Sequence, residues 1–148
     1  MSPVAKGTAI GGVLAGINLG KGFPDIDIRL LGIGGHRNWL FHSAATSALL
    51  YGATKWYSRR LETVEGDDLQ KMVLKYVGAP IMAAFCAANA AHHFADMLGA
   101  KDVVGWPVGL LLRGGMWKDR IWLGVNGVIS LGLAWKFIKI TVSDELIP

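Results

Sequence analysis

The chain has 148 residues, of which 52% are hydrophobic and 18% are charged, and its formal net charge is +4. Soluble domains carry about a quarter of their residues as Asp, Glu, Lys or Arg. This composition, together with six tryptophans, therefore favours an integral membrane protein, because Trp gathers at membrane interfaces. The scattered cationic residues exclude a nucleic-acid-binding tract and suit contact with anionic membrane lipids.

The first half of the chain contains two apolar segments. The segment Gly7–Gly20 is uncharged but is shorter than the roughly 20 residues of a membrane span. Gly12, Gly16 and Gly20 recur at every fourth position, which predicts a short, buried or re-entrant glycine-rich helix that another backbone can approach closely. Trp39–Tyr57 carries a single charged residue near its end and is the first clear span.

The second half contains two further spans and one broken segment. Tyr76–Phe94 is free of formal charge when its histidines are neutral, and we expect Pro80 to kink it. Val103–Leu112 is too short to cross and is interrupted by Gly and Pro. Ile121–Ile140 is the last span. The length of 148 residues allows one membrane domain, residues 1–148.

These segments together predict an all-α fold. We expect an integral membrane helical bundle of three to four spans, with a short glycine-rich first helix and a re-entrant or interfacial segment after the third. The Lys and Arg residues are divided almost equally between the two faces, so the positive-inside rule does not fix the orientation.

Two polar stretches interrupt the apolar pattern. The first, Phe23–Ser43, is rich in Gly and opens with Pro24, so an irregular loop is expected. The second, Asn89–Asp96, places polar residues at i, i+3, i+4 and i+7, which is one face of a helix. The polar side chains of interest are Asp25, Asp27, His36, Arg37, His42 and Ser43 in the first stretch, and Asn89, His92, His93 and Asp96 in the second.

The two polar stretches are expected to meet. The spans Trp39–Tyr57 and Tyr76–Phe94 are consecutive and joined by a short charged connection, so they run antiparallel. His42 is placed about one turn into the first span, and His92 and Asp96 fall near the end of the second. Both sets therefore lie at one membrane face, and polar groups in an apolar span turn toward protein rather than lipid.

A mixed set of His and Asp side chains is typical of a metal site. Imidazole and carboxylate ligands suit Zn²⁺, Mn²⁺ or Fe²⁺, and the set has room for one or two divalent ions. Taken singly, each residue could equally be a hydrogen-bonded packing or capping group; the gathering of four histidines and three acids at one face favours a metal site. The candidate ligands are Asp25, Asp27, His36, His42, His92 and Asp96.

The order of these motifs resembles a known family. Pro24-Asp25-x-Asp27, His36-Arg37, His42-Ser43 and His92-x-x-x-Asp96 are similar to the motifs of the YdjM-like membrane-bound, metal-dependent hydrolases, over about half the chain. The resemblance implies a metal site built from the same six candidates, with Arg37 and Ser43 as supporting groups. Members of that family often carry a histidine in the first helix, where this chain has only Asn18 as a polar amide.

Two functions are therefore expected from the sequence. The first is a membrane-embedded, metal-dependent hydrolase that acts near one membrane face on a lipid phosphoester or another amphiphile. In it, Asp25, Asp27 or Asp96 would take a proton from water and Arg37 would stabilise developing negative charge. The alternative is a non-catalytic small membrane subunit of a larger assembly, with a structural metal or polar cluster, which the glycine stripe and the missing first-helix histidine favour.

An ion path ranks lower, because the polar residues gather at one end of the spans. The expected partners are membrane lipids and, in the alternative, membrane proteins or a second copy of the chain, with no nucleic acid. The expected location is the bacterial inner membrane or an equivalent.

Overall fold

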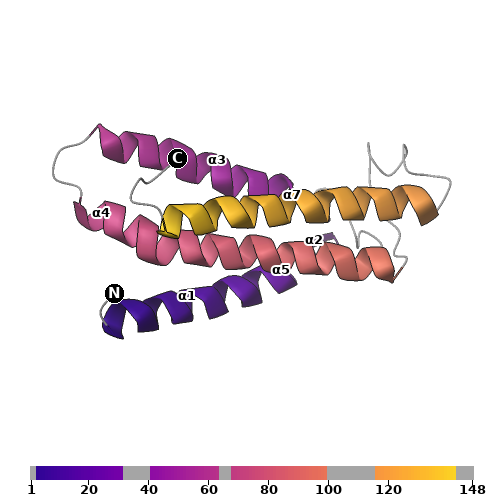
Figure 1. Ribbon diagram of the computed structural model, residues 1–148. Coiled ribbons are helices and arrows are strands. Elements are labelled where there is room, and N and C mark those ends of the chain that lie inside the picture. Colours follow the sequence, from indigo (N-terminus) through magenta and orange to yellow (C-terminus); the bar gives the residue numbers. More distant parts are fainter. Residues whose placement is uncertain (1–2, 32–40, 64–67, 100–115, 143–148) are drawn as a thin grey trace.

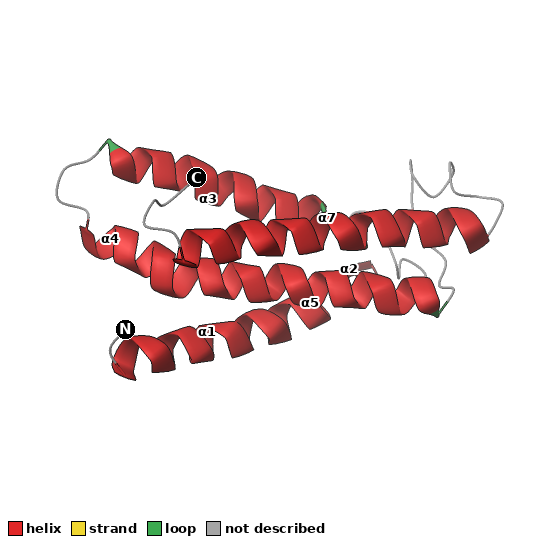
Figure 2. Cartoon of the chain, viewed as in Figure 1, coloured by secondary structure: helices red, strands yellow, loops and turns green. Residues whose placement is uncertain are grey.

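The chain folds as a bundle of helices (Figures 1 and 2). The computed structural model describes residues 3–31, 41–63, 68–99 and 116–142, and every regular element in these ranges is a helix. The predicted all-α class is thus confirmed. The predicted re-entrant or interfacial segment Val103–Leu112 lies outside the described residues.

The helices share one arrangement around a long central element. α1 runs parallel to α5 on one side, α7 lies antiparallel along another side of α5, and α3 packs near α7 and α5 (Figure 1). α4, η2 and α5 form one continuous helix, Asp68–Leu98, in which η2 is a π-helical stretch. The bounds are α1 Pro3–Gly22, α2 Ile26–Leu31, α3 Ala45–Glu62, α4 Asp68–Val73, η2 Leu74–Gly78, α5 Ala79–Leu98 and α7 Met116–Val142.

Two helices among the described residues are long and apolar enough to cross a membrane. They are Asp68–Leu98 and Trp117–Val142, and they contain the predicted spans Tyr76–Phe94 and Ile121–Ile140. Two of the three to four predicted spans are thus found among the described residues. The predicted span Trp39–Tyr57 is not one of them. The remaining long helices, α1 and α3, do not reach the same length and hydropathy within the described part of the chain.

The helix that follows the first polar stretch begins later than predicted. Phe41 to Ala44 form a turn, and α3 starts at Ala45 rather than at Trp39. The Ser43 hydroxyl accepts a hydrogen bond from the backbone N–H of Ala45 at 3.2 Å, a local bond that competes with helix formation. His42 therefore precedes the helix, and its predicted position one turn inside a span is wrong.

The central helix passes through a proline without ending. Pro80 has no N–H, so it cannot complete the usual i to i−4 hydrogen bond within a helix. The chain adapts immediately before it: the N–H of Ala79 bonds to the carbonyl of Leu74, five residues back. Such a π turn inserts one extra residue into the helix, and it lies immediately before Pro80, where a kink was predicted.

Glycines bring α1 into close contact with α5. α1 has 20 residues and is longer than the 14-residue segment predicted for it. A Cβ at Gly16 would overlap the carbonyl oxygen of Ile81, and one at Gly20 would overlap that of Phe85. The glycine stripe thus serves packing inside the chain, in the manner of small residues at membrane helix interfaces.

α7 exposes many large apolar side chains. Ile121, Val128 and Trp135 are 64%, 63% and 59% exposed, whereas the buried face combines the polar Asn126 with the apolar Phe137. In a water-soluble helix the apolar face turns inward and the polar face outward. The exposed apolar side chains of α7 are therefore typical of a surface that is covered by lipid or by another apolar partner.

Replacement of Gly16 by Ala is expected to loosen the contact between α1 and α5. The new methyl group must displace the α5 backbone, and overpacking of this kind costs about 1–3 kcal/mol of unfolding free energy. The matched control is Gly11→Ala, because a Cβ at Gly11 meets nothing within 4 Å and gains helix propensity of up to about 1 kcal/mol. Thermal unfolding of both variants in detergent measures the difference; equal midpoints would refute the close α1–α5 contact.

Candidate metal centre

The turn that carries His42 is held by α7. The indole N–H of Trp122 donates to the carbonyl oxygen of His42 at 3.1 Å, and the side-chain oxygen of Asn126 accepts the backbone N–H of Ala44 at 2.8 Å. Trp122 and Asn126 are four residues apart, so one face of α7 supplies both bonds. Neither residue was among the candidate site residues; their i, i+4 spacing in the last span was the available signal.

A second set of polar contacts fixes α5 beside α3. The side-chain amide of Asn89 donates to the hydroxyl of Ser47 at 3.2 Å, and both residues are fully buried. His93, also fully buried, has its Nδ1 2.6 Å from the carbonyl oxygen of Asn89. Because a carbonyl oxygen can only accept, Nδ1 carries the hydrogen. His93 is therefore oriented by its own helix.

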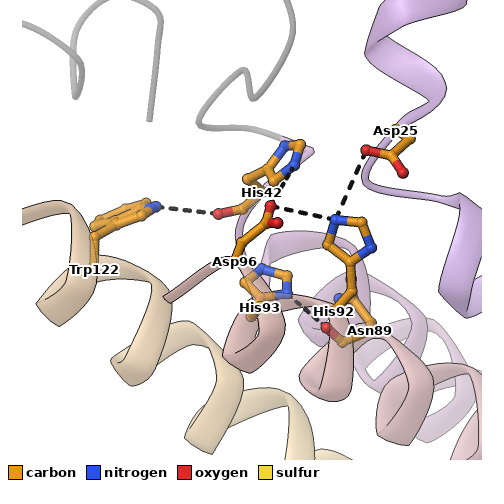
Figure 3. Close-up of polar contacts among 7 residues, drawn as sticks. All are labelled: Asp25, His42, Asn89, His92, His93, Asp96 and Trp122. Carbon is orange, nitrogen blue, oxygen red and sulfur yellow. Dashed lines mark hydrogen bonds and ion pairs between the residues drawn. The ribbon is translucent and has the colours of Figure 1, made fainter. Parts of the chain in front are cut away.

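Asp25 lies in a turn rather than in an irregular loop. Pro24 is buried, and the N–H groups of Ile26 and Ile28 bond to the carbonyls of Phe23 and Asp25 at 3.1 and 3.2 Å. These bonds begin the short helix α2, so the expectation of irregular structure from Phe23 onward is corrected here. The turn presents the Asp25 carboxylate toward α5 (Figure 3).

The side chains of three separate segments converge on the end of α5 (Figure 3). Nε2 of His42 and Nε2 of His92 each lie 3.4 Å from the same carboxylate oxygen of Asp96. Nε2 of His92 also lies 3.7 Å from a carboxylate oxygen of Asp25. The two imidazole rings have centroids 5.5 Å apart. The predicted meeting of His42, His92 and Asp96 is confirmed.

The separations among these atoms fit ligands around a shared ion. A direct hydrogen bond between a charged donor and a carboxylate measures about 2.7–2.9 Å, which is shorter than every contact in the cluster. Two ligands held about 2.1 Å from one metal ion at a tetrahedral angle lie about 3.4 Å apart. One donor atom from each of Asp25, His42 and His92 also lies within 4.8 Å of the others. These residues could hold a metal ion.

Burial and charge support the same interpretation. The His42 side chain is fully buried, those of His92 and Asp96 are 15% exposed, and that of Asp25 is 47% exposed. Two carboxylates thus face two imidazoles at a largely dry site, where uncompensated negative charge is costly. A divalent cation would balance both acids, and access to it would come from the Asp25 side.

Four of the six predicted ligands come together. They are Asp25, His42, His92 and Asp96. Asp27 falls within α2, where the structure describes its backbone but not its side chain. His36 and the predicted supporting group Arg37 also lie outside the described residues.

Comparisons with models of protein families, with characterised proteins and with solved structures find no match to this chain.

Removal of one ligand should abolish tight binding of a divalent ion. We expect His92→Ala and Asp96→Asn to lower Zn²⁺ or Mn²⁺ affinity by more than about 100-fold, beyond what loss of an outer hydrogen-bond partner costs. The control is Asp68→Asn, an exposed acid in the first turn of α4. Elemental analysis of the purified proteins after dialysis against each metal reads out the result. Equal metal content in all four proteins would rule out this centre.

The contact between Trp122 and the His42 turn should matter for metal affinity. Trp122→Phe keeps the aromatic ring but removes the N–H donor, so the turn loses one of its two side-chain anchors. We expect metal affinity to fall by about tenfold, as for other groups that orient a ligand. Trp117→Phe, an exposed position on the same helix, serves as the control. A metal titration in which both variants match the natural protein would show that this anchor is dispensable.

Proposed function

We propose that this chain is a membrane-embedded, metal-dependent hydrolase that acts near one membrane face on a lipid phosphoester or a similar amphiphile. The observation that carries the proposal is the convergence of His42, His92, Asp96 and Asp25 at one end of the bundle. Two imidazoles and a carboxylate, with one position left for water, are the typical ligand set of catalytic zinc sites. The exposed part of the Asp25 side chain gives water access to the cluster.

Embedding in a membrane is supported by the two apolar helices and by the large apolar side chains that α7 exposes. Asn126 and Ser130 face inward, whereas Ile121, Val128 and Trp135 face outward. In lipid such an outward face meets hydrocarbon, and polar side chains within a span turn toward protein. The bacterial inner membrane or an equivalent bilayer is the proposed location.

The four residues divide into different roles by exposure. His42, His92 and Asp96 are the more buried and would hold the ion. The half-exposed Asp25 stands at the rim, where its carboxylate can accept a proton from water. The bound ion would lower the pKa of water toward neutrality and polarise the ester oxygen. Asp27 and Arg37 keep the roles predicted for them from sequence, as proton acceptor and as stabiliser of negative charge.

The alternative is a non-catalytic subunit in which the same cluster stiffens the fold. One specific observation favours it: the contacts that orient the cluster, from Trp122 and Asn126, also tie α7 to the rest of the bundle. The glycine stripe does not favour this alternative. Gly16 and Gly20 already contact the backbone of α5 within the same chain, so they are not a surface for a second protein.

Hydrolysis should depend on the rim carboxylate as well as on the ligands. In assays against amphiphilic phosphoesters, we expect Asp25→Asn to lower turnover by about 10²–10⁴, the usual contribution of a general base, and to leave metal largely bound. His42→Ala and Asp96→Asn should lose both metal and turnover. Asp68→Asn should behave as the natural protein.

The same variants separate the two functions. A structural role predicts that His42→Ala lowers the thermal midpoint or dissolves an assembly, with no substrate turned over by the natural protein. Turnover that survives in both His42→Ala and Asp96→Asn would contradict the hydrolase proposal outright.

A further inference from the structure

A cavity of about 600 Å³ opens beside the candidate metal centre. This volume falls within the range of roughly 300–1,000 Å³ typical of small-molecule sites. Its walls come from the end of α1, from α2, from the start of α3 and from the first half of α5. Asp25 belongs both to these walls and to the metal cluster, so the cavity and the proposed reaction site are contiguous.

The cavity has both polar and apolar walls. Its charged residues are Asp25, which also belongs to the cluster, and Arg29, both on the segment around α2. Asn18 and Thr46 add two uncharged polar side chains. The other walls include Leu50 from α3 and Ile81 and Met82 from α5. Ile81 precedes His92 by 11 positions in the helix formed by Asp68–Leu98, which is about 16 Å along the axis.

This direction matters because α5 belongs to a candidate membrane span. The cavity follows α5 away from the cluster and into the span, where the surroundings are hydrocarbon. A long alkyl chain can therefore lie along the apolar walls with little loss of solvation, since burial of apolar surface is favourable at roughly 25 cal/mol per Å². A compact polar molecule would fill only the mouth.

The charged residues of the cavity determine which headgroup the ligand can carry. Arg29 is exposed and lines the cavity, and its guanidinium is suited to bidentate contact with phosphate oxygens. With a divalent ion balancing Asp25 and Asp96, the mouth presents net positive charge. A headgroup that is anionic and bears phosphate oxygens complements it.

We infer that this cavity binds one hydrocarbon chain of a phosphate-bearing amphiphile, with the phosphate at Arg29 and the chain directed along α5 toward Ile81. The inference rests on the proposed function only in placing the ester bond at the metal cluster. Binding itself requires the apolar walls and Arg29. The site can therefore be tested with a ligand that has no ester to hydrolyse.

The test uses hexadecylphosphonate with the full-length protein in detergent micelles, and native mass spectrometry to count bound ligand. Hexadecanol has the same chain without the charge, and methylphosphonate has the same headgroup without the chain. We expect hexadecylphosphonate to bind about tenfold more tightly than hexadecanol, which corresponds to about 1.4 kcal/mol. Methylphosphonate should not bind measurably.

Two kinds of variant separate the chain from the headgroup. Leu50→Trp fills the cavity and should weaken hexadecylphosphonate about tenfold, whereas Leu49→Trp, at a 72% exposed neighbouring position, should not. Met82→Trp fills the same space from α5 and serves if Leu50→Trp does not fold. Arg29→Gln should remove the preference for the phosphonate and leave hexadecanol binding unchanged.

The outcomes distinguish this site from the proposed activity. Suppose that the filling variants block phosphonate binding in a protein that hydrolyses no ester. That result would support ligand binding in the cavity and contradict the hydrolase proposal. If metal-dependent hydrolysis is unchanged in Leu50→Trp, Met82→Trp and Arg29→Gln, the cavity is not the ligand site. The hydrolase proposal would then still hold. Equal binding of hexadecylphosphonate and hexadecanol overturns the role of Arg29.

Discussion

The carboxylate of Asp96 is the point on which the structure converges, because one of its oxygens lies equally close to the imidazoles of His42 and His92. This contact joins the turn before α3 to the end of α5, segments separated by some fifty residues. The turn that carries His42 needs hydrogen bonds from other elements to hold its position, since it has no regular backbone hydrogen bonds of its own. α7 supplies that support through Trp122 and Asn126, so three elements are required to place one pair of ligands.

Close packing at the other side of α5 serves the same site. The glycines of α1 let its backbone reach that of α5, and α1 leads directly into the turn that presents Asp25. The distance from the last buried glycine, Gly20, to Asp25 is only five residues, so the position of this acid follows from the helix contact. Packing and chemistry are thus coupled along one short segment, and the cavity beside it lies where α1 and α3 leave part of α5 uncovered.

Much of this organisation could be predicted from sequence, for identifiable reasons. Antiparallel order and the i, i+3, i+4, i+7 spacing of Asn89–Asp96 are properties of helices, so the convergence of His42 with His92 followed from them. The start of α3 could not be predicted in this way, because a local hydrogen bond from the Ala45 N–H to the Ser43 hydroxyl overrides an apolar pattern that continues through the turn. The i, i+4 spacing of Trp122 and Asn126 places them on one face of α7, but it does not show which neighbour each side chain meets. The role of Arg29 likewise depends on its neighbours. The length of α1 was missed because the predicted segment was limited to the uncharged residues between Lys6 and Lys21, and these charged residues do not end the helix.

The exposed apolar side chains of α7 have a consequence for how such a chain can vary. At outward positions such as Ile121 and Val128 the side chain is exposed, so exchange among Ile, Leu, Val and Phe there costs little packing. The inward positions tolerate less, because side chains such as Asn126 and Phe137 are packed against their neighbours. Neutral substitution would therefore change most of the exposed residues and leave a small number of inward residues unchanged. For a bundle of this kind, the spacing of the inward residues would identify a homologue better than overall sequence identity.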